Sequence, residues 1–278
     1  MYKRGARMKK KGIALVERQY LFPFVLITSL FFLWGFAHAI LDVLNKHFQE
    51  LLTITRTHSA MIQATMYMGY FIMAIPAGLF INRHGYRRGV VLGLLLYGTG
   101  SLLFIPGQYI ASFNMFLFSL FVIGCGLTFL ETAANPYVTE LGARETAASR
   151  LNFAQSFNGL GCIFAPILTG LLLFSDDDKG AGGNVALPYA VMGVVVLLAA
   201  LAFVRVPLPE IPHEEEVDSE GRRVSLWSHK LFVFGLAALF AYEVAEISIN
   251  SFFINYVTEV GWMNARDASL VLSFGGLG

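Results

Sequence analysis

Charged side chains are scarce in this chain. Asp, Glu, Lys and Arg make up 14% of its 278 residues, against a hydrophobic share of 56%. A soluble domain of this length needs a far more charged surface. The net charge is only +1, and the basic residues are not laid out as a stripe, so a nucleic-acid partner is not expected. The composition therefore excludes most soluble classes and indicates a membrane protein.

Cysteine and histidine are also scarce. The two cysteines, Cys125 and Cys162, both fall inside apolar segments. They are expected to be small buried hydrophobic residues that form no disulfide. The six histidines are scattered without the spacing of metal ligands, so no metal site is expected.

Long apolar runs are abundant. A helix needs about 20 residues to cross a hydrocarbon core of about 30 Å, and seven runs are long enough to be spans of an all-α polytopic membrane protein. They are Leu21–Val43, His58–Ile81, Val90–Pro106, Phe113–Val138, Leu151–Phe174, Leu187–Val204 and Leu231–Val257. An eighth run, Arg266–Gly278, has 13 residues, which reach only about 20 Å as a helix. We therefore expect a truncated, N-terminal fragment of a longer protein.

Lysine and arginine predict the orientation. The N-terminal tail and the second, fourth and sixth links together hold 16 of these residues, and the opposite side holds 4. By the positive-inside rule, the N-terminus and the sixth link are cytoplasmic. We expect a multi-pass protein of the bacterial inner membrane.

The link Pro207–His229 is long and charged, and it predicts a boundary between two parts. Residues 1–205 are expected to form an N-terminal six-helix transmembrane bundle, 206–229 a cytoplasmic loop, and 230–278 the start of a C-terminal bundle. This layout is typical of transporters built from two six-helix halves. The span count alone also allows a six-span membrane enzyme or a channel module.

A basic motif follows the second span. It resembles the loop signature of the major facilitator superfamily, Gly-x-x-x-Asp-Arg-x-Gly-Arg-Arg, and departs from it where Asn replaces Asp. Its arginines could bond helix-end carbonyls and so hold one conformation closed. Gly78 could allow close helix approach, and Gly85 could allow a tight turn. The alternative is a basic turn needed only for topology. The residues of this candidate conformational latch are Gly78, Asn82, Arg83, Gly85, Arg87 and Arg88.

One acidic residue interrupts the first apolar span and another interrupts the fourth. Ionisable groups are costly in lipid, so they usually face an internal cavity and mark an ion or substrate pathway. Glu131 lies well inside the fourth span and shares a helical face with Thr128 and Asn135. Asp42 lies near the outer end of the first span. Alternatively, Glu131 has only a structural role and is satisfied by hydrogen bonds, and Asp42 is simply solvated near the membrane interface.

Polar residues also mark the fifth and seventh spans. Amides suit sugar hydroxyls because each offers donors and an acceptor, but they equally hold helices together. The fifth span carries Asn152, Gln155, Ser156 and Asn158, and the seventh carries Glu243, Glu246 and Asn250 at helical spacing.

Several segments together resemble the fucose:proton symporter family, which includes glucose/galactose permeases. They are Phe31–Phe36, Asp42–Gln49, Gly69–Gly78, Leu130–Tyr137 and Arg150–Gly159. The resemblance implies proton coupling at Asp42 and Glu131, sugar binding at Glu131, and a sugar cavity lined by Gln155 and Asn158. The chain departs from the fucose permease at His38-Ala39-Ile40, where that protein is rich in Asn, and at Glu246, where it has Gln. Because of these two departures, the sequence does not determine which sugar is transported.

The sequence thus predicts a transporter and not an enzyme: a proton-coupled symporter of L-fucose or a related hexose such as glucose or galactose, working by alternating access. The proton is the only expected cofactor, the partners are a small sugar and the lipid bilayer, and the complete protein is expected to be monomeric. The predicted substrate-binding residues are Glu131, Asn135, Gln155, Asn158, Glu246 and Asn250. The alternative is a non-transporting truncated product, or a membrane sugar sensor derived from such a transporter.

Overall fold

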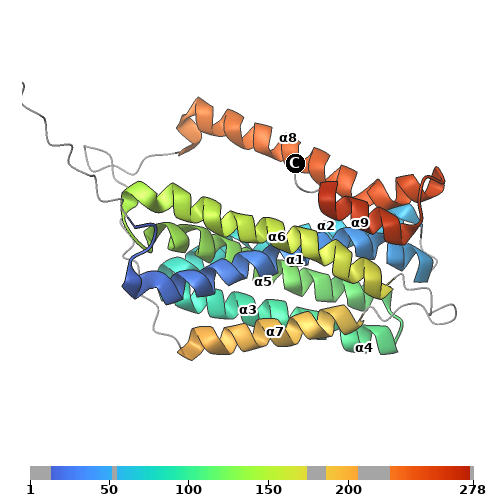
Figure 1. Ribbon diagram of the computed structural model, residues 1–278, viewed down its shortest axis with the longest axis horizontal. Helices are drawn as coiled ribbons and strands as arrows, with labels where there is room; N and C mark the ends of the chain where they lie inside the picture. Colours follow the sequence, from blue (N-terminus) through green and yellow to red (C-terminus); the bar gives the residue numbers. More distant parts are fainter. Residues whose placement is uncertain (1–13, 52–54, 174–185, 206–225, 276–278) are drawn as a thin grey trace, which may run out of the picture.

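The computed structural model describes residues 14–51, 55–173, 186–205 and 226–275, without the side chains at 42, 44–51, 56–57, 170–173 and 273–275. Within these ranges the secondary structure is helical (Figure 1). The α-helices are α1 Leu21–Leu51, α2 Arg56–His84, α3 Tyr86–Leu102, α4 Phe104–Tyr109, α5 Phe113–Glu140, α6 Ala147–Leu173, α7 Ala186–Arg205, α8 Lys230–Glu259 and α9 Ala265–Gly275. The predicted all-α membrane class is confirmed.

Each predicted span corresponds to helix in the structure. Six stretches are long and apolar enough to cross a membrane: Arg18–Leu41, His58–His84, Tyr86–Tyr109, Phe113–Glu140, Ala186–Arg205 and Lys230–Glu259. The predicted fifth span lies in α6, which has 27 residues. The predicted third span covers α3 and α4, which are separated only at Leu103. Most of the link 206–229 lies outside the described residues, so the predicted division into two parts stays a prediction.

Glycines set which helices pack closely. The main pairs are α1 with α6, α2 with α5, α3 with α5 and α3 with α7. A Cβ on Gly161 of α6 would lie 2.7 Å from the Phe36 amide nitrogen of α1, and one on Gly35 of α1 would clash with the Asn158 carbonyl of α6. Since small residues let membrane helices approach until their backbones touch, the two glycines account for the tight α1–α6 contact.

The same arrangement recurs at the three other contacts. A Cβ on Gly69 of α2 would lie 2.7 Å from a carbonyl oxygen of α5, and one on Gly93 of α3 would lie 2.8 Å from another. Gly98 of α3 and Gly193 of α7 face each other, with a separation of 3.1 Å from the built Cβ on Gly193 to the Gly98 oxygen. The close backbone contacts thus form two groups, α1 with α6 and α2–α5–α3–α7, and further contacts of α1 with α2 and α5 join the two groups.

The two glycines of the basic link behave differently. Gly85 joins α2 to α3 with a φ of +85°, a conformation that side chains disfavour, so the predicted tight turn is confirmed. Among the described residues a Cβ on Gly78 would meet nothing within 4 Å, so a close helix approach at this glycine stays a prediction. Gly69 of α2 does lie against a neighbouring helix, α5.

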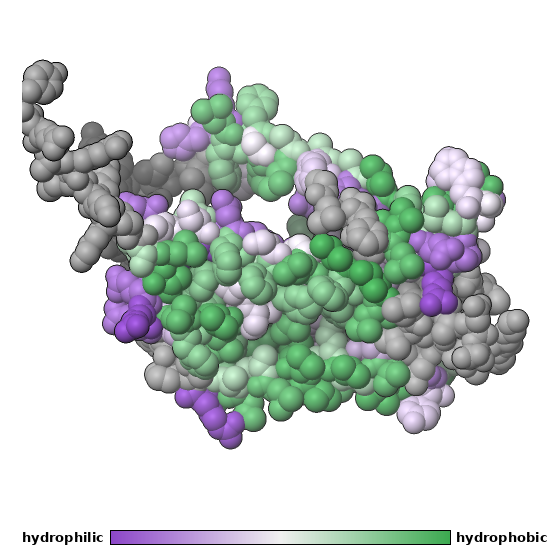
Figure 2. Space-filling view, viewed as in Figure 1, coloured by the Kyte–Doolittle hydropathy of each residue, from purple (hydrophilic) through white to green (hydrophobic). Residues whose placement is uncertain are grey.

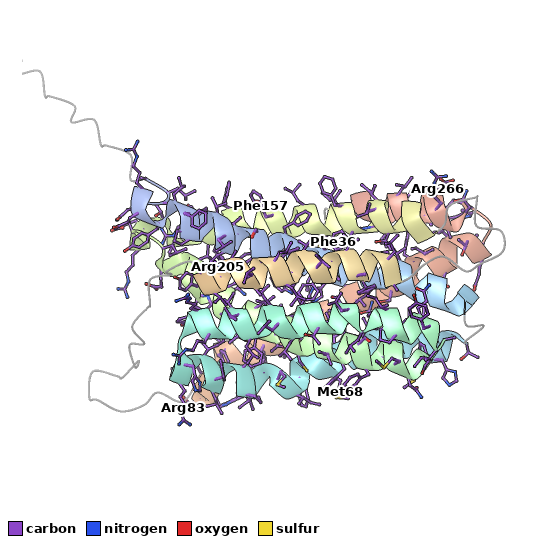
Figure 3. The ribbon with its side chains drawn as sticks, turned by 90° about the horizontal axis from the view of Figure 1, so that it is seen from below. Phe36, Met68, Arg83, Phe157, Arg205 and Arg266 are labelled. Carbon is purple, nitrogen blue, oxygen red and sulfur yellow. The ribbon has the colours of Figure 1, made fainter. Side chains whose placement is uncertain are left out.

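The surface has the pattern of a membrane protein. Figure 2 shows hydrophobic residues over the middle of the body and hydrophilic ones gathered toward its two ends. Arg83 and Arg205 lie at one end of the bundle, and Arg266 lies at the other (Figure 3). This matches the predicted alternation of links, in which the second and sixth links share a side.

The α8 helix stands apart from this body. In Figure 1 the first half of α8 lies apart from the other helices, and its second half lies closer to them, near α9. Leu231 is 89% exposed and Phe240 is 72% exposed. The buried residues of α8 lie near its end: Ser251, Ile254, Asn255 and Val257. Among the described residues, the buried part of the helix is in its last turns, and the helix contacts α1 and α9.

Candidate functional site

A small, partly open recess lies between α1 and α5. Glu131 lies in the middle of α5 and lines this recess together with Asn135. Most of the lining is apolar or aromatic, and the full set is Leu30, Phe31, Trp34, Leu130, Glu131, Ala134 and Asn135. A carboxyl and an amide group therefore face a largely apolar space inside the bundle.

The predicted face of α5 is only partly turned toward this recess. Thr128 is buried, and its hydroxyl donates to the Gly124 carbonyl at 2.8 Å, within its own helix. Glu131 and Asn135 lie one and two turns further along and are half-buried. Pro136 follows without ending the helix. Of the three residues predicted to share a face, Glu131 and Asn135 are thus available to a ligand.

Glu131 has electrostatic partners on two other helices. Glu243 of α8 is close enough for the two negative charges to repel. Glu131 would also repel a deprotonated Tyr70 of α2. A proton on one carboxyl group would remove the repulsion between Glu131 and Glu243. Side chains of α2, α5 and α8 therefore share one electrostatic environment around the recess.

A hydrogen-bonded aromatic network adjoins the recess on the side of α1 and α2. The Trp34 indole nitrogen donates to the Tyr70 hydroxyl oxygen at 3.0 Å. The Tyr70 hydroxyl lies 3.3 Å from His38 Nε2, and His38 Nδ1 lies 3.1 Å from the Trp34 carbonyl oxygen. Tyr67 contacts His38 and Tyr70 through its ring. Trp34 thus lines the recess while its N–H is bonded to Tyr70.

Sequence reasoning gave no role to His38 or Tyr70. Trp34 and His38 stand four residues apart on α1, and Tyr67 and Tyr70 stand three apart on α2. These spacings place each pair on one helical face, which is the signal that could have suggested a cluster. The chain alone does not say that the two faces meet, because that depends on how α1 and α2 pack.

The amides of α6 divide into two groups. Gln155 is exposed, and its Nε2 lies 3.5 Å from Asn135 Oδ1, beside the recess. Asn158 is half-buried and donates to the Phe31 carbonyl of α1 at 3.3 Å. Asn158 thus ties α6 to α1, the alternative role for such amides, and Gln155 is the better placed of the two to meet a ligand.

The remaining predicted binding residues lie on α8 and at the outer end of α1. Glu246 is exposed, and its carboxyl group accepts a hydrogen bond from Tyr242 on the same helix. Asn250 is half-buried. Neither lines the recess around Glu131. Asp42 lies on α1 two turns beyond Trp34, and its side chain is outside the described residues.

The basic link makes one contact with a neighbouring helix through Arg87. Its guanidinium donates to the carbonyl oxygens of Phe203, at 3.1 Å, and Val204, at the C-terminal end of α7. Bonding to helix-end carbonyls is thus observed for Arg87. Asn82, Arg83 and Arg88 are exposed. A latch function stays a prediction.

Arg150, which the sequence analysis counted only for topology, is a second arginine at helix-end carbonyls. It lies in the first turn of α6, is fully buried, and donates to the Val138 carbonyl at 3.0 Å and to the Thr139 carbonyl at the end of α5. It also donates to the Ala143 carbonyl at 3.0 Å and to the Leu15 carbonyl at 3.2 Å. One side chain therefore joins the N-terminal segment, α5 and α6.

Binding of a metal ion requires several ligand side chains close together. In the part of the chain that the structure describes, no three or more His, Cys, Asp or Glu side chains gather closely enough to hold a metal ion. The site around Glu131 is instead a carboxyl, amide and aromatic site, which suits hydrogen bonding to a polar organic ligand.

Known proteins share this architecture. Residues 24–278 match the family model described as Major Facilitator Superfamily. The chain is 36% identical over 259 residues to the "Glucose/galactose transporter" of Brucella abortus biovar 1 (strain 9-941), a match that covers 91% of this chain and 63% of that protein. It is 35% identical over 282 residues to the "L-fucose-proton symporter" of Escherichia coli (strain K12), covering 92% of this chain and 64% of that one.

A solved structure agrees with these relatives. The crystal structure of "a Major Facilitator Superfamily (MFS) transporter, FucP, in the outward conformation" superposes with a TM-score of 0.68 at 34% identity, covering 92% of this chain and 68% of that one. The predicted resemblance to the fucose:proton symporter family is thereby confirmed. The chain spans slightly less than two thirds of the length of the curated relatives it matches.

Proposed function

Since this chain belongs to the Major Facilitator Superfamily, we propose that it carries a sugar together with a proton across a membrane by alternating access. The similar proteins are named as a glucose/galactose transporter and an L-fucose-proton symporter. The proposed substrates are therefore L-fucose or a related hexose such as glucose or galactose, with the proton as coupling ion and no other cofactor.

One observation carries this proposal: Glu131 lies in the middle of a membrane helix and lines a recess together with Asn135 and Trp34. Carboxyl and amide groups pair with sugar hydroxyls as donors and acceptors. The indole face of Trp34 offers an apolar surface for the C–H side of a pyranose ring. A lone acid in a span is costly unless it serves such a pathway.

Coupling would follow from the two ligands sharing Glu131. A protonated Glu131 can donate a hydrogen bond to a sugar hydroxyl, and a bound sugar would in turn favour the protonated form. Binding free energies are reciprocal, so each ligand strengthens the other by the same factor. Asp42, nearer the outer end of α1, is the second proposed coupling residue.

The second wall of the sugar site would come from the other half of the protein. In transporters of two halves, the substrate binds between the halves and rocking exposes it to each side in turn. Glu246 and Asn250 of α8 are the proposed contributions from this chain, and Gln155 and Asn158 those from α6. Arg87 and the other basic residues of the link would act as the latch, and the complete protein would work as a monomer.

The proposed location is the bacterial inner membrane with a cytoplasmic N-terminus, supported by the 16-to-4 distribution of Lys and Arg. In a variant with Cys125 and Cys162 replaced by alanine, Tyr109→Cys should react with an impermeant maleimide added to intact cells. Glu145→Cys, at the opposite end of α5, should react only after the cells are opened. Labelling of position 145 in intact cells would reverse the orientation.

Transport is tested on a longer protein. It is made by joining to this chain the segment by which the relatives extend beyond the matched region, and it is called the completed protein below. In proteoliposomes with an imposed pH gradient, at least one of radiolabelled L-fucose, glucose and galactose should accumulate, and dissipating the gradient should abolish accumulation. The 278-residue chain alone should accumulate none, because the first half of α8 has no facing wall. Sugar binding by the completed protein without transport would contradict the symporter and favour the sensor.

A further inference from the structure

The Trp34 side chain belongs to a closed network of three hydrogen bonds. Its indole N–H donates to the Tyr70 hydroxyl oxygen at 3.0 Å. The Tyr70 hydroxyl lies 3.3 Å from His38 Nε2, and His38 Nδ1 lies 3.1 Å from the Trp34 carbonyl oxygen. The network therefore begins on the side chain of Trp34 and returns to its backbone, by way of one residue of α2 and one of α1.

The chemistry of the partners determines the direction of each bond. A carbonyl oxygen only accepts hydrogen bonds, so Nδ1 of neutral His38 carries the proton and donates to Trp34. Nε2 then has a lone pair and accepts from the Tyr70 hydroxyl, whose oxygen accepts from the indole N–H. Each of the three bonds thus has one donor and one acceptor, and the network closes without a conflict.

This network engages the one polar atom of the Trp34 side chain. An indole N–H has a single hydrogen to donate and cannot accept. In the described part of the chain, neither Tyr70, which receives this hydrogen, nor His38 lines the recess. Trp34 does line the recess, so it can offer a ligand there apolar contact but no hydrogen bond.

The two walls of the recess consequently differ in polarity. The α1 wall consists of Leu30, Phe31 and Trp34, with the Phe31 and Trp34 ring centres 6.1 Å apart. The two polar side chains, Glu131 and Asn135, belong to the α5 wall. A pyranose carries both hydroxyl groups and C–H groups, so its hydroxyls can pair with the α5 wall while its C–H groups contact the α1 wall.

Resting on the proposed function, we propose that Tyr70 and His38 are positioning residues that hold the Trp34 indole against the C–H groups of the sugar. Tyr70 holds the indole directly and keeps its N–H out of the recess. His38 acts by orienting the Tyr70 hydroxyl, and its ring also meets the Trp34 ring edge to face at 5.7 Å. A ring that is fixed before binding favours the complex, because less side-chain freedom is lost when the sugar binds.

Hydrogen exchange at the indole N–H tests the network in the 278-residue chain without any sugar. The chain has three tryptophans, so Trp34→Phe identifies the Trp34 signal in a ¹⁵N–¹H spectrum. Tyr70→Phe should accelerate exchange of this hydrogen for deuterium by about two- to tenfold, the factor that corresponds to one hydrogen bond. The matched control is Tyr256→Phe, which alters a ring 5.8 Å from another tryptophan, Trp262, and should leave the exchange at Trp34 unchanged.

The contribution of His38 is measured in the same experiment by a double-mutant cycle. His38→Leu should accelerate exchange at Trp34 by a smaller factor, about twofold, because the indole keeps its acceptor and loses only the group that orients it. With Tyr70→Phe already present, His38→Leu should have little further effect. Unchanged exchange at Trp34 in Tyr70→Phe, or an undiminished effect of His38→Leu in that background, would overturn the proposal.

Sugar exchange by the completed protein separates positioning from direct contact. Tyr70→Phe should raise the half-saturating sugar concentration about two- to tenfold and keep the maximal rate within about twofold, since it weakens binding without touching the coupling acid. In the Trp34→Phe background no indole N–H remains to be held, so Tyr70→Phe should have no further effect. An undiminished effect there would show that Tyr70 touches the sugar itself and would contradict the proposal. If no sugar is carried at all, the proposed function fails, and the indole exchange rates alone decide whether the network holds Trp34.

Discussion

The α5 and α8 helices are similar in sequence and opposite in environment. They have 28 and 30 residues, each is apolar enough to span a membrane, and each has acidic residues in its interior. In the most apolar stretch of α5, 67% of the residues are buried, whereas in that of α8 the share is 0% among the described residues. Composition therefore identifies both as membrane helices without indicating which one belongs to a packed core.

Glycines mark the contacts that α5 makes with its neighbours among the described residues. A Cβ on Gly126 of α5 would lie 2.6 Å from a carbonyl of α3, and one on Gly124 would clash with a carbonyl of α2. A Cβ on Gly235 of α8 would meet nothing within 4 Å. In α5, glycine meets the backbone of two neighbouring helices, and the half-buried acid of that helix, Glu131, faces a recess. Glu246 of α8 is exposed.

The largest stability effect is expected at the junction that anchors α5. Arg150→Lys keeps the charge but loses the planar fork that reaches several carbonyls. Hydrogen bonds to charged groups contribute about 1.5–3 kcal/mol each, so losing two should cost at least about 3 kcal/mol. Thermal unfolding in detergent should show a marked loss for Arg150→Lys and little change for the exposed Arg144→Lys. Equal stability of the two variants would show that Arg150 does not hold the junction.

A smaller loss of stability is expected when one methyl group is added at the contact between α1 and α6. Gly161→Ala should destabilise the chain by about 1–3 kcal/mol, as overpacking does, because the facing atoms are backbone and cannot move aside. The matched control is Gly159→Ala, two residues earlier on α6, where a Cβ meets nothing within 4 Å. That variant should be neutral or stabilised by up to about 1 kcal/mol. If both variants behave alike, glycine contacts do not decide which helices form the core.

The fold was largely predictable from the sequence because a membrane helix is specified by length and apolarity, which are properties of one segment. The alternation of links between the two ends followed from the positions of arginine and lysine. Packing was less predictable, since it depends on two segments at once. Gly78 and Gly161 look alike in the sequence, yet within the described part of the chain Gly161 lies against another helix and Gly78 does not.

The candidate site was predictable in part for the same reason. Glu131 was identified because an acid within an apolar span is unusual by itself. The roles of Arg150 and of the His38–Tyr70 pair could not be predicted, because each depends on partners far away in the sequence. Asn158 illustrates the remaining ambiguity: an amide suits a sugar or a helix contact equally, and here it bonds the Phe31 carbonyl.

The central claim is that Glu131 couples the proton to the sugar, and one measurement tests it directly. In proteoliposomes containing the completed protein, sugar exchange at equilibrium and uphill accumulation under a pH gradient are compared for Glu131→Gln and for Glu140→Gln, an exposed acid at the end of the same helix. Glutamine mimics the protonated carboxyl group, so Glu131→Gln should retain exchange within about threefold, a difference of less than 1 kcal/mol, and lose accumulation. Glu140→Gln should retain both. Accumulation of sugar against its gradient by the Glu131→Gln variant would contradict the account.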